Sequence, residues 1–175
     1  MRRAVFPATF DPIHYGHIDI AERAARVFDE VYVGIYAHSA KKLFFTPEER
    51  LRLVTESLQH IPNIQVSLYS GLTVQYAKQV GAMAVVRGLR VFSDFELEFR
   101  MALANRRLEP SIEVVNFIAG EEFLHLSSST VREIASLGGN VSTFVPPHVA
   151  DALQRRFAEL NQSGTPPNYM ISLQD

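Results

Sequence analysis

The chain has 175 residues and a formal net charge of −2, from 17 basic and 19 acidic side chains, and 47% of its residues are hydrophobic. That length and composition suit one globular domain that buries its own core. The sequence contains no cysteine, which excludes disulfides and thiolate zinc sites, and its balanced charge argues against nucleic-acid or membrane partners. With no hydrophobic run of about 18 residues and no signal-peptide pattern, we expect a cytoplasmic protein.

Strand-like hydrophobic runs alternate with helix-period segments along the chain. We expect strands at residues 3–7, 30–37, 64–69, 82–86 and 112–119. We expect helices at residues 16–28, 46–60, 72–80, 94–108, 129–137 and 147–160. This alternation predicts an α/β, Rossmann-like fold: an open parallel five-stranded sheet with helices on both faces, in a single domain over residues 1–160. Residues 161–175 are polar and are expected to form a flexible C-terminal tail.

The turn after the first expected strand carries Thr9, Asp11, His14, Gly16 and His17. In an open parallel sheet, ligands bind at the carboxyl ends of the strands. Gly16 permits close approach to the start of a helix, whose N-terminus favours anions, and a histidine there donates a hydrogen bond to a phosphate oxygen. Two simpler interpretations remain open: a capped turn with two surface histidines, and a zinc site at His14 and His17.

Two further turns also suit phosphate. Lys41 and Lys42 follow the second strand, although paired loop lysines are usually only solvated. After the fifth strand, residues 127–130 supply four consecutive hydroxyls where one would cap the next helix. No G-x-S-x-G pattern surrounds them, so a catalytic serine is not expected.

Two arginines, Arg87 and Arg90, flank a Gly-Leu pair after the fourth expected strand. They form either a fork of donors for an anion or ion pairs with the acidic residues Asp94, Glu96 and Glu98. Neither of the common glycine-rich nucleotide loops is present in the sequence. Phosphate-binding residue types at four strand ends together predict a nucleotide site built without such a loop, which a purely structural α/β module would not explain.

The sequence resembles a known family over roughly residues 1–160. "TFDPIHYGH" (9–17) is similar to the T-F-D-P-x-x-x-G-H signature of the nucleotidyltransferase superfamily, in which an H/T-x-G-H motif follows the first strand. Within that superfamily the chain resembles the bacterial phosphopantetheine adenylyltransferase family. The similar segments are residues 41–53, 71–78, 85–108 and 122–146.

The resemblance implies that the adenylyl group of ATP is transferred to 4′-phosphopantetheine, giving dephospho-coenzyme A and pyrophosphate, the penultimate step of coenzyme A biosynthesis. The substrate phosphate attacks in line, so no protein nucleophile is required. Mg²⁺ is the implied cofactor, held mainly by the ATP phosphates and without protein ligands. The resemblance further implies a homohexamer, and coenzyme A as an inhibitor. We expect exposed apolar residues such as Phe44 or Phe92 to serve an interface.

Site residues follow from the same resemblance. The implied catalytic residues are His17, Thr9, Lys41 and Arg90. The implied contacts of phosphopantetheine are Thr9, Lys41, Thr73 and Arg87. The implied contacts of ATP are Thr9, Phe10, His17, Gly88, Leu89, Arg90, Glu98, Phe123, Leu124, His125, Leu126, Ser127, Ser128 and Ser129.

Three positions depart from the family pattern: Phe6, Ala8 and His14 stand where Tyr, Gly and Thr are usual. An alanine in place of glycine would be strained if its φ were positive. Two other functions remain open. One is a sister enzyme with nicotinate mononucleotide or glycerol 3-phosphate as acceptor, against which the pantetheine-like segments argue. The other is a non-catalytic nucleotide sensor, which would not need His17, Lys41, Arg87 and Arg90 together.

Overall fold

The computed structural model describes residues 1–38 and 43–162. Its strands are β1 (Arg3–Ala8), β2 (Glu30–Tyr36), β3 (Ile64–Tyr69), β4 (Ala84–Leu89) and β5 (Glu113–Ile118). Its helices are α1 (Tyr15–Val27), α2 (Pro47–Leu58), α3 (Thr73–Gln79), α4 (Phe92–Leu108), the short 3₁₀ turn η1 (Glu121–Phe123), α5 (Ser128–Ser136) and α6 (Pro147–Gln162).

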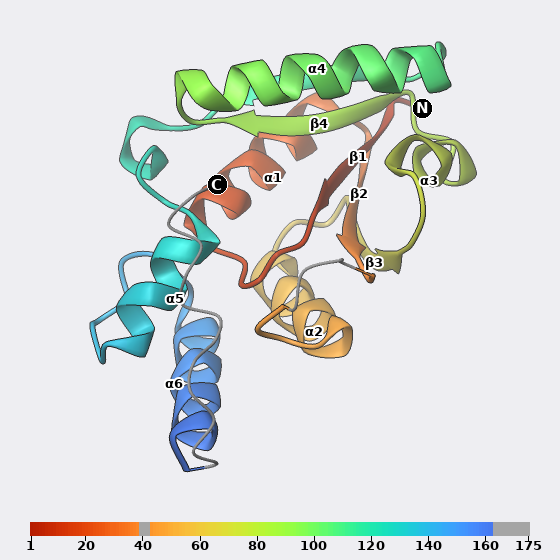
Figure 1. The fold of residues 1–175 in the computed structure, drawn as a ribbon. Helices are drawn as coiled ribbons and strands as arrows, with labels where there is room; N and C mark the ends of the chain where they lie inside the picture. Colours follow the sequence, from red (N-terminus) through yellow and green to blue (C-terminus); the bar gives the residue numbers. More distant parts are fainter. Residues whose placement is uncertain (39–42, 163–175) are drawn as a thin grey trace.

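The five strands form one parallel sheet in the order β3-β2-β1-β4-β5 (Figure 1). The predicted fold class is therefore confirmed. The chain first builds outward from β1 to β3 and then returns to the other side of β1 with β4. This reversal places a topological switch point between β1 and β4, where open α/β sheets bind ligands.

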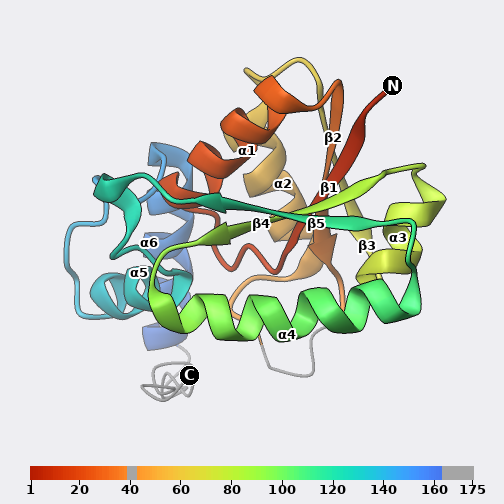
Figure 2. The ribbon, with the colours of Figure 1, turned by 90° about the horizontal axis from the view of Figure 1, so that it is seen from above.

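Helices cover both faces of the sheet. Figure 2 shows α4 along one side of β4 and β5, with α1 on the opposite side. The larger core cluster joins β1 and β2 to α1, α2 and α6, and a smaller cluster on the other face includes Tyr69, Tyr76 and Val85. Both faces of the central strands are thus buried, which explains why those strands lack a polar alternation.

β1 and β4 separate towards their carboxyl ends. β1 pairs with β2 along its whole length, whereas its pairing with β4 ends at Val5 and Val85. Beyond that point Pro7 has no N–H to continue a ladder. The guanidinium of Arg87 lies between the strands instead, and its Nη1 donates to the Pro7 carbonyl at 2.9 Å. The strands thereby open a crevice at the switch point.

Helix α2 begins as its sequence predicts. Oγ1 of Thr46 accepts from the N–H of Glu49 at 3.2 Å, and Oε2 of Glu49 accepts from the N–H of Thr46 at 2.8 Å. Pro47 occupies the first helical position, where its missing N–H costs nothing. The reciprocal cap fixes where α2 starts, and with it the position of Arg50 one turn later.

Several predicted boundaries are wrong by two or three residues, including the end of α2 at Leu58 rather than residue 60. β4 runs from Ala84 to Leu89 rather than over 82–86, so Arg87 and Gly88 lie within the strand and not in the turn after it. α4 begins at Phe92, before the predicted start at residue 94. α6 continues to Gln162, two residues into the segment predicted to be a tail.

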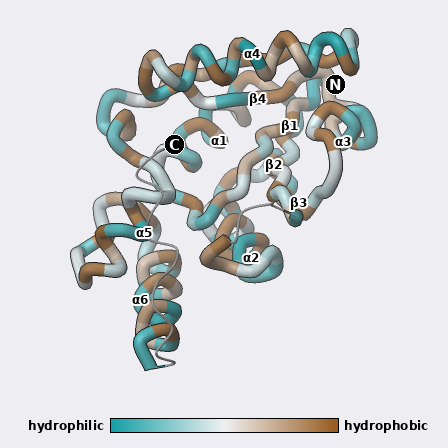
Figure 3. The backbone as a smooth tube through the Cα atoms, in the orientation of Figure 1, coloured by the Kyte–Doolittle hydropathy of each residue, from teal (hydrophilic) through white to brown (hydrophobic). Residues whose placement is uncertain are grey.

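Helix α4 has a weak division between polar and hydrophobic faces. Figure 3 shows hydrophobic residues recurring along its whole length. Phe92 is 89% exposed, whereas Phe44, the other aromatic expected at an interface, is only 5% exposed and packs against Phe45 and Phe157. The expectation that Phe44 is exposed is therefore wrong. No helix among the described residues is long and apolar enough to cross a membrane.

Candidate active site

A cavity of about 320 Å³ lies at the crevice between β1 and β4. Its walls come from the ends of both strands, the start of α1, the first two turns of α4, η1 and the start of α5. The sequence-predicted site residues that line it are His17, Arg87, Gly88, Arg90, Glu98, Phe123, Ser127 and Ser128. The parallel topology thus brings together residues from three separate segments of the sequence.

His17 is held in one orientation by its neighbours. The backbone N–H of His14 donates to Nδ1 of His17 at 3.3 Å. The ring of Phe10 packs edge-on against the His17 ring, with 4.9 Å between centroids. Because Nδ1 accepts a hydrogen bond, the proton of the neutral ring belongs on Nε2. Burial, followed by nearby positive charge that includes Arg90 and Arg87, lowers the pKa of His17 well below its ordinary value. His17 is therefore a neutral donor through Nε2–H.

His14 is also buried, which excludes the interpretation that both histidines are surface residues. It is 5% exposed, and its ring stacks on that of His17 with 3.7 Å between centroids. Burial, with a contribution from the charge of Arg90, lowers its pKa to about 3. Nδ1 of His14 has no hydrogen-bond partner. A Cβ on Gly16 would lie 3.1 Å from this ring, so the glycine makes room for it.

The alternative of a zinc pair finds no support in the described part of the chain. Among residues 1–38 and 43–162, no cluster of three or more His, Asp or Glu side chains is arranged to hold a metal. His14 and His17 therefore have no third protein ligand within those ranges. The stacked pair instead lies at the start of α1, where N–H groups of the first turn favour an anion.

Arg87 connects the sheet to α4. Its Nε and Nη2 donate to the two carboxylate oxygens of Glu98 at 2.8 and 2.6 Å, while Nη1 holds the Pro7 carbonyl. The Glu98 side chain is 9% exposed and that of Arg87 is 36% exposed. The predicted ion pair with an acidic residue is therefore present, and the arginine still lines the cavity.

Arg90, directly after β4, makes a similar pair with the first turn of α4. Its Nε donates to Oδ2 of Asp94 at 3.1 Å, and its Nη1 donates to the carbonyl of Leu126 at 2.6 Å. The third acidic candidate, Glu96, instead pairs with Arg100 on the same helix, at 3.5 Å. Arg90 thereby ties the end of β4 to the segment that leads into α5.

The serine hydroxyls at the start of α5 both hold the local structure and face the cavity. Oγ of Ser127 accepts from the N–H of Thr130 at 3.0 Å and thus caps the helix. Ser128 donates from Oγ to the carbonyl of Pro12 at 2.8 Å. Ser127 and Ser128 line the cavity together with the positive end of the helix dipole.

Several predicted residues lie elsewhere. Phe10 and Leu126 are buried, at 1% and 2% exposed, and neither lines the cavity. Oγ1 of Thr73 is 3.0 Å from the Tyr69 hydroxyl, at the start of α3 and outside the cavity lining. Lys41 falls outside the described residues. The remaining candidates outside the lining are Thr9, Leu89, Leu124, His125 and Ser129.

The departure at Ala8 carries no backbone strain. Ala8 ends β1 and lines the cavity. Among the described residues, Phe10 is the non-glycine residue with a positive φ, at 50°. The left-handed position in this turn is therefore two residues beyond the one where the family usually has glycine, and a methyl group at Ala8 is compatible with its strand conformation.

Three charged residues around the turn, two of them buried, were not given a site role from the sequence. The carboxylate of Asp11 accepts from the N–H groups of Phe44 and Phe45, at 2.8 and 2.9 Å. Arg132 of α5 donates to the carbonyl of Asp11. Arg50 of α2 is 0% exposed and donates to the carbonyl of Thr9. The available signal was a charged residue on the apolar face of each helix.

The chain is similar to known proteins in sequence and in fold. A family model described as cytidylyltransferase-like matches residues 5–134. The phosphopantetheine adenylyltransferase of Herpetosiphon aurantiacus is 48% identical over 163 residues, covering 93% of this chain and 99% of the relative. That of Thermomicrobium roseum is 50% identical over 161 residues, covering 90% and 96%. A solved structure from Vibrio parahaemolyticus, described as a "Putative Nicotinate-nucleotide Adenylyltransferase", matches with a TM-score of 0.66 over 99% of this chain and 98% of the other; at 20% identity it supports the fold alone.

Proposed function

The chain belongs to the cytidylyltransferase-like family, and from that premise we propose that it transfers the adenylyl group of ATP to 4′-phosphopantetheine, giving dephospho-coenzyme A and pyrophosphate. Relatives that carry this activity in their names match nearly the whole chain at 48–50% identity. The observation that carries the proposal is the cavity itself. There a neutral histidine donor, two arginines and two helix N-termini meet at the switch point of the sheet.

The chemistry needs orientation and charge neutralisation rather than a protein nucleophile. The phosphate of the acceptor is already an anion, and it attacks the α-phosphorus of ATP while the bond to pyrophosphate breaks. His17 acts as a hydrogen-bond donor through Nε2–H to the oxygens that gain charge, and it keeps its proton throughout. A neutral imidazole suits this role because the nearby arginines already supply positive charge.

Arg87 and Arg90 would bind phosphate oxygens with donors that now engage carboxylates. Arg87 also donates to the carbonyl of Pro7, and Arg90 to that of Leu126. These bonds would keep each guanidinium in the cavity wall while its other donors turn from the carboxylate to a phosphate. Planar guanidinium groups suit bidentate contact with phosphate. Ser127 and Ser128 at the start of α5 would complete the anion site on the nucleotide side.

Mg²⁺ is part of the proposal as an ion that enters with the nucleotide. The carboxylates that line the cavity, Asp94 and Glu98, are both engaged by arginines. A hard cation that prefers oxygen ligands and keeps several waters fits a site where the phosphates supply its ligands. When bound, it would screen the charge of the phosphates as the two anions approach.

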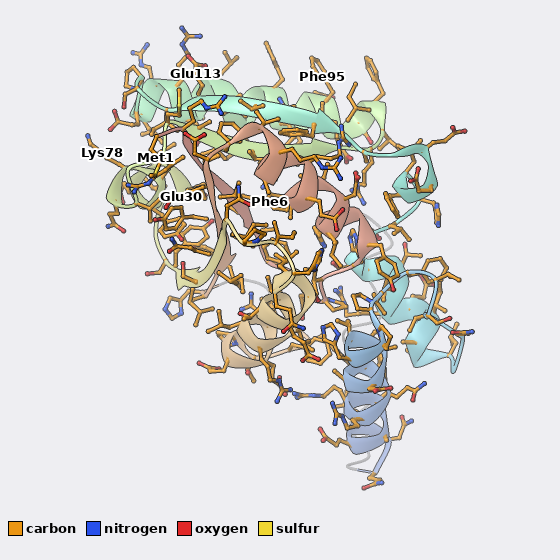
Figure 4. The ribbon with its side chains drawn as sticks, turned by 180° about the vertical axis from the view of Figure 1, so that it is seen from behind. Met1, Phe6, Glu30, Lys78, Phe95 and Glu113 are labelled. Atoms are coloured by element: carbon orange, nitrogen blue, oxygen red, sulfur yellow. The ribbon has the colours of Figure 1, made fainter. Side chains whose placement is uncertain are left out.

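Assembly, regulation and location complete the proposal. We expect the protein to form a homohexamer and to lie in the cytoplasm. We also expect coenzyme A to inhibit it, and neither a membrane nor a nucleic acid to be its partner. The support for assembly is the exposed apolar surface of α4, including Phe92, Phe95 and Phe99, which are 89%, 49% and 52% exposed. Figure 4 shows Phe95 pointing outward from α4, away from the sheet. A face of this kind on a single chain is typical of a surface that another subunit covers.

The test is pyrophosphate release from ATP and Mg²⁺ with each acceptor in turn. We expect release with 4′-phosphopantetheine and only background release with nicotinate mononucleotide or glycerol 3-phosphate. Release with another acceptor alone would establish the sister-enzyme alternative. ATP binding measured by calorimetry without release on any acceptor would establish the nucleotide sensor instead.

A further inference from the structure

Arg50 is a fully buried cation whose partners are backbone carbonyls. It lies on α2 and is 0% exposed. Its Nη1 donates to the carbonyl of Thr9 at 2.7 Å and to that of Tyr36 at 2.9 Å. Among the described residues no carboxylate forms an ion pair with it, although the charges of Asp11 and Glu48 act on it, and its Nε has no hydrogen-bond partner. Burial lowers the pKa of this guanidinium from its ordinary value, although the group stays charged.

Both carbonyls lie at the carboxyl edge of the sheet. The ladder between β1 and β2 ends at the pair Ala8 and Ile35. Thr9 and Tyr36 are the next residues on each strand, and one nitrogen of Arg50 joins them where the ladder stops. Arg50 therefore ties the entrance of the turn over residues 9–14 to the end of β2.

This contact sets the direction of the next peptide group. The bond between Thr9 and Phe10 is trans, because the cis bond among the described residues is the one before Pro12. In a trans peptide the C=O and the following N–H point in opposite directions. With the Thr9 carbonyl held towards Arg50, the N–H of Phe10 points away from Arg50 and out of the buried face of α2.

The same contact supports the catalytic donor. Phe10 has a φ of 50°, its ring is 1% exposed, and that ring packs edge-on against His17 at 4.9 Å. From the opposite side, Arg132 and Ser128 of α5 hold the carbonyls of Asp11 and Pro12. Side chains from two helices thus fix the turn, and Arg50 supplies the contact from α2.

We propose that Arg50 is a positioning residue for nucleotide binding: its guanidinium holds the Thr9–Phe10 peptide so that the Phe10 ring supports His17, the donor that lines the cavity. The inference rests on the proposed function for the identity of the nucleotide. A buried cation without a carboxylate partner costs stability compared with an apolar side chain, so packing alone does not account for it. Its positive charge, lying directly beneath the turn, would also favour the anionic phosphates.

The test compares Arg50→Met with Arg3→Met. Met keeps much of the apolar volume of Arg50 and removes both hydrogen bonds. Arg3 is the matched control because it also ties elements at one edge of the sheet, bonding Glu30 of β2 and the carbonyl of Val80, but at the amino ends of the strands. Calorimetric titration with ATP gives two readouts for each variant: the stoichiometry reports the folded fraction, and Kd reports the geometry of the site.

We expect Arg50→Met to raise the Kd for ATP at least fivefold at unchanged stoichiometry, and Arg3→Met to leave Kd within twofold of the original. A Kd for Arg50→Met within twofold, or an equal rise in both variants, would overturn the assignment. If Arg50→Met does not fold, Arg50→Lys decides by the same readout: a weakened Kd in the folded protein supports the proposal and an unchanged one overturns it. Pyrophosphate release by the unaltered protein tests the proposed function separately, because the binding comparison stands without turnover.

Discussion

Arginines lie at both edges of the parallel sheet, the amino edge where its strands begin and the carboxyl edge where they end, but they have different surroundings at each. At the amino edge, Arg2 pairs with Asp29 at 2.9 Å and Arg3 with Glu30 at 2.6 Å. Figure 4 shows Glu30 near Met1, at the outside of the molecule, whereas Phe6 of the same strand pair lies in its interior. Each cation at this edge has its own carboxylate and partial access to water, so the edge has little remaining affinity for an anion.

At the carboxyl edge, positive charge is less completely matched. The hydrogen-bond partners of Arg50 are carbonyls, while Arg87 and Arg90 have carboxylate partners but also line the cavity. Two uncharged histidines lie beside them. The same residue type therefore stabilises one edge and prepares the other for phosphates, and the difference lies in the partners. Three experiments can break or sharpen this comparison.

The largest effect is expected from His17→Ala at the carboxyl edge. Losing one preorganised donor to a developing charge costs about 3–4 kcal/mol of transition-state stabilisation, so we expect kcat to fall at least a hundredfold. His17→Gln should retain part of the activity, since its amide can place an N–H near the position of Nε2. Steady-state pyrophosphate release measures both variants.

His60→Ala is the matched control for His17→Ala. His60 bonds Glu22 at 2.9 Å on the surface, and its side chain is 54% exposed. It should turn over at the original rate, and circular dichroism should show all three variants folded. A folded His17→Ala with near-normal kcat would contradict the role assigned to the histidine pair.

A smaller effect is expected on the free energy of unfolding, which should fall in acid because the buried histidines resist protonation. His14 has a pKa of about 3 in the folded protein, and about 6.5 is usual for an exposed or unfolded histidine. Below pH 6.5 the unfolded chain binds a proton that the folded chain does not, so stability falls as pH decreases through this window. For His14 alone the loss at pH 5 is about 2 kcal/mol relative to neutral pH.

Urea unfolding at pH 7.5 and pH 5 measures this loss. His14→Gln removes the titrating group while keeping a polar side chain of similar length, so its free energy of unfolding should fall less between the two values. Equal falls in the variant and the original protein would mean that His14 is not held neutral by burial. The amino edge offers no comparable buried histidine among the described residues.

Much of the fold was predictable because each element carries its own local pattern. Alternating strand-like and helix-period segments predicted the parallel sheet, and the capping box at Thr46 predicted where α2 begins. β4 was cut short because charged Arg87 looks like the end of a buried strand. Glu98 of α4, eleven residues later, neutralises this charge. The sequence offered that pairing as one of three, but it did not show that the strand continues through Arg87.

The site was predictable to the extent that it lies at strand ends. Parallel topology alone brings such ends together, which is why His17, Arg87, Arg90 and Ser127 share one cavity. Arg50 was missed because a charged residue in an amphipathic helix usually faces solvent. Its burial depends on the carbonyls of two strand ends, and that is a tertiary property.

The smallest expected effect compares two matched ion pairs, Arg87–Glu98 at the carboxyl edge and Arg3–Glu30 at the amino edge. Their shortest distances are equal at 2.6 Å and the two arginines are equally exposed at 36%, but the carboxylates differ, at 9% for Glu98 and 25% for Glu30. A less exposed carboxylate is less screened by water, so we expect the Arg87–Glu98 pair to show the larger coupling energy, about 1–2 kcal/mol.

Double-mutant cycles with Met for arginine and Gln for glutamate measure both couplings by urea unfolding. Raising the salt concentration should weaken the Arg3–Glu30 coupling more, because exposed charges are screened first. Adding inorganic phosphate at constant ionic strength should weaken only the Arg87–Glu98 coupling, since the anion competes with Glu98 for the guanidinium. If phosphate weakened both pairs equally, the carboxyl edge would have no special affinity for anions, and the contrast between the two edges would be one of burial alone.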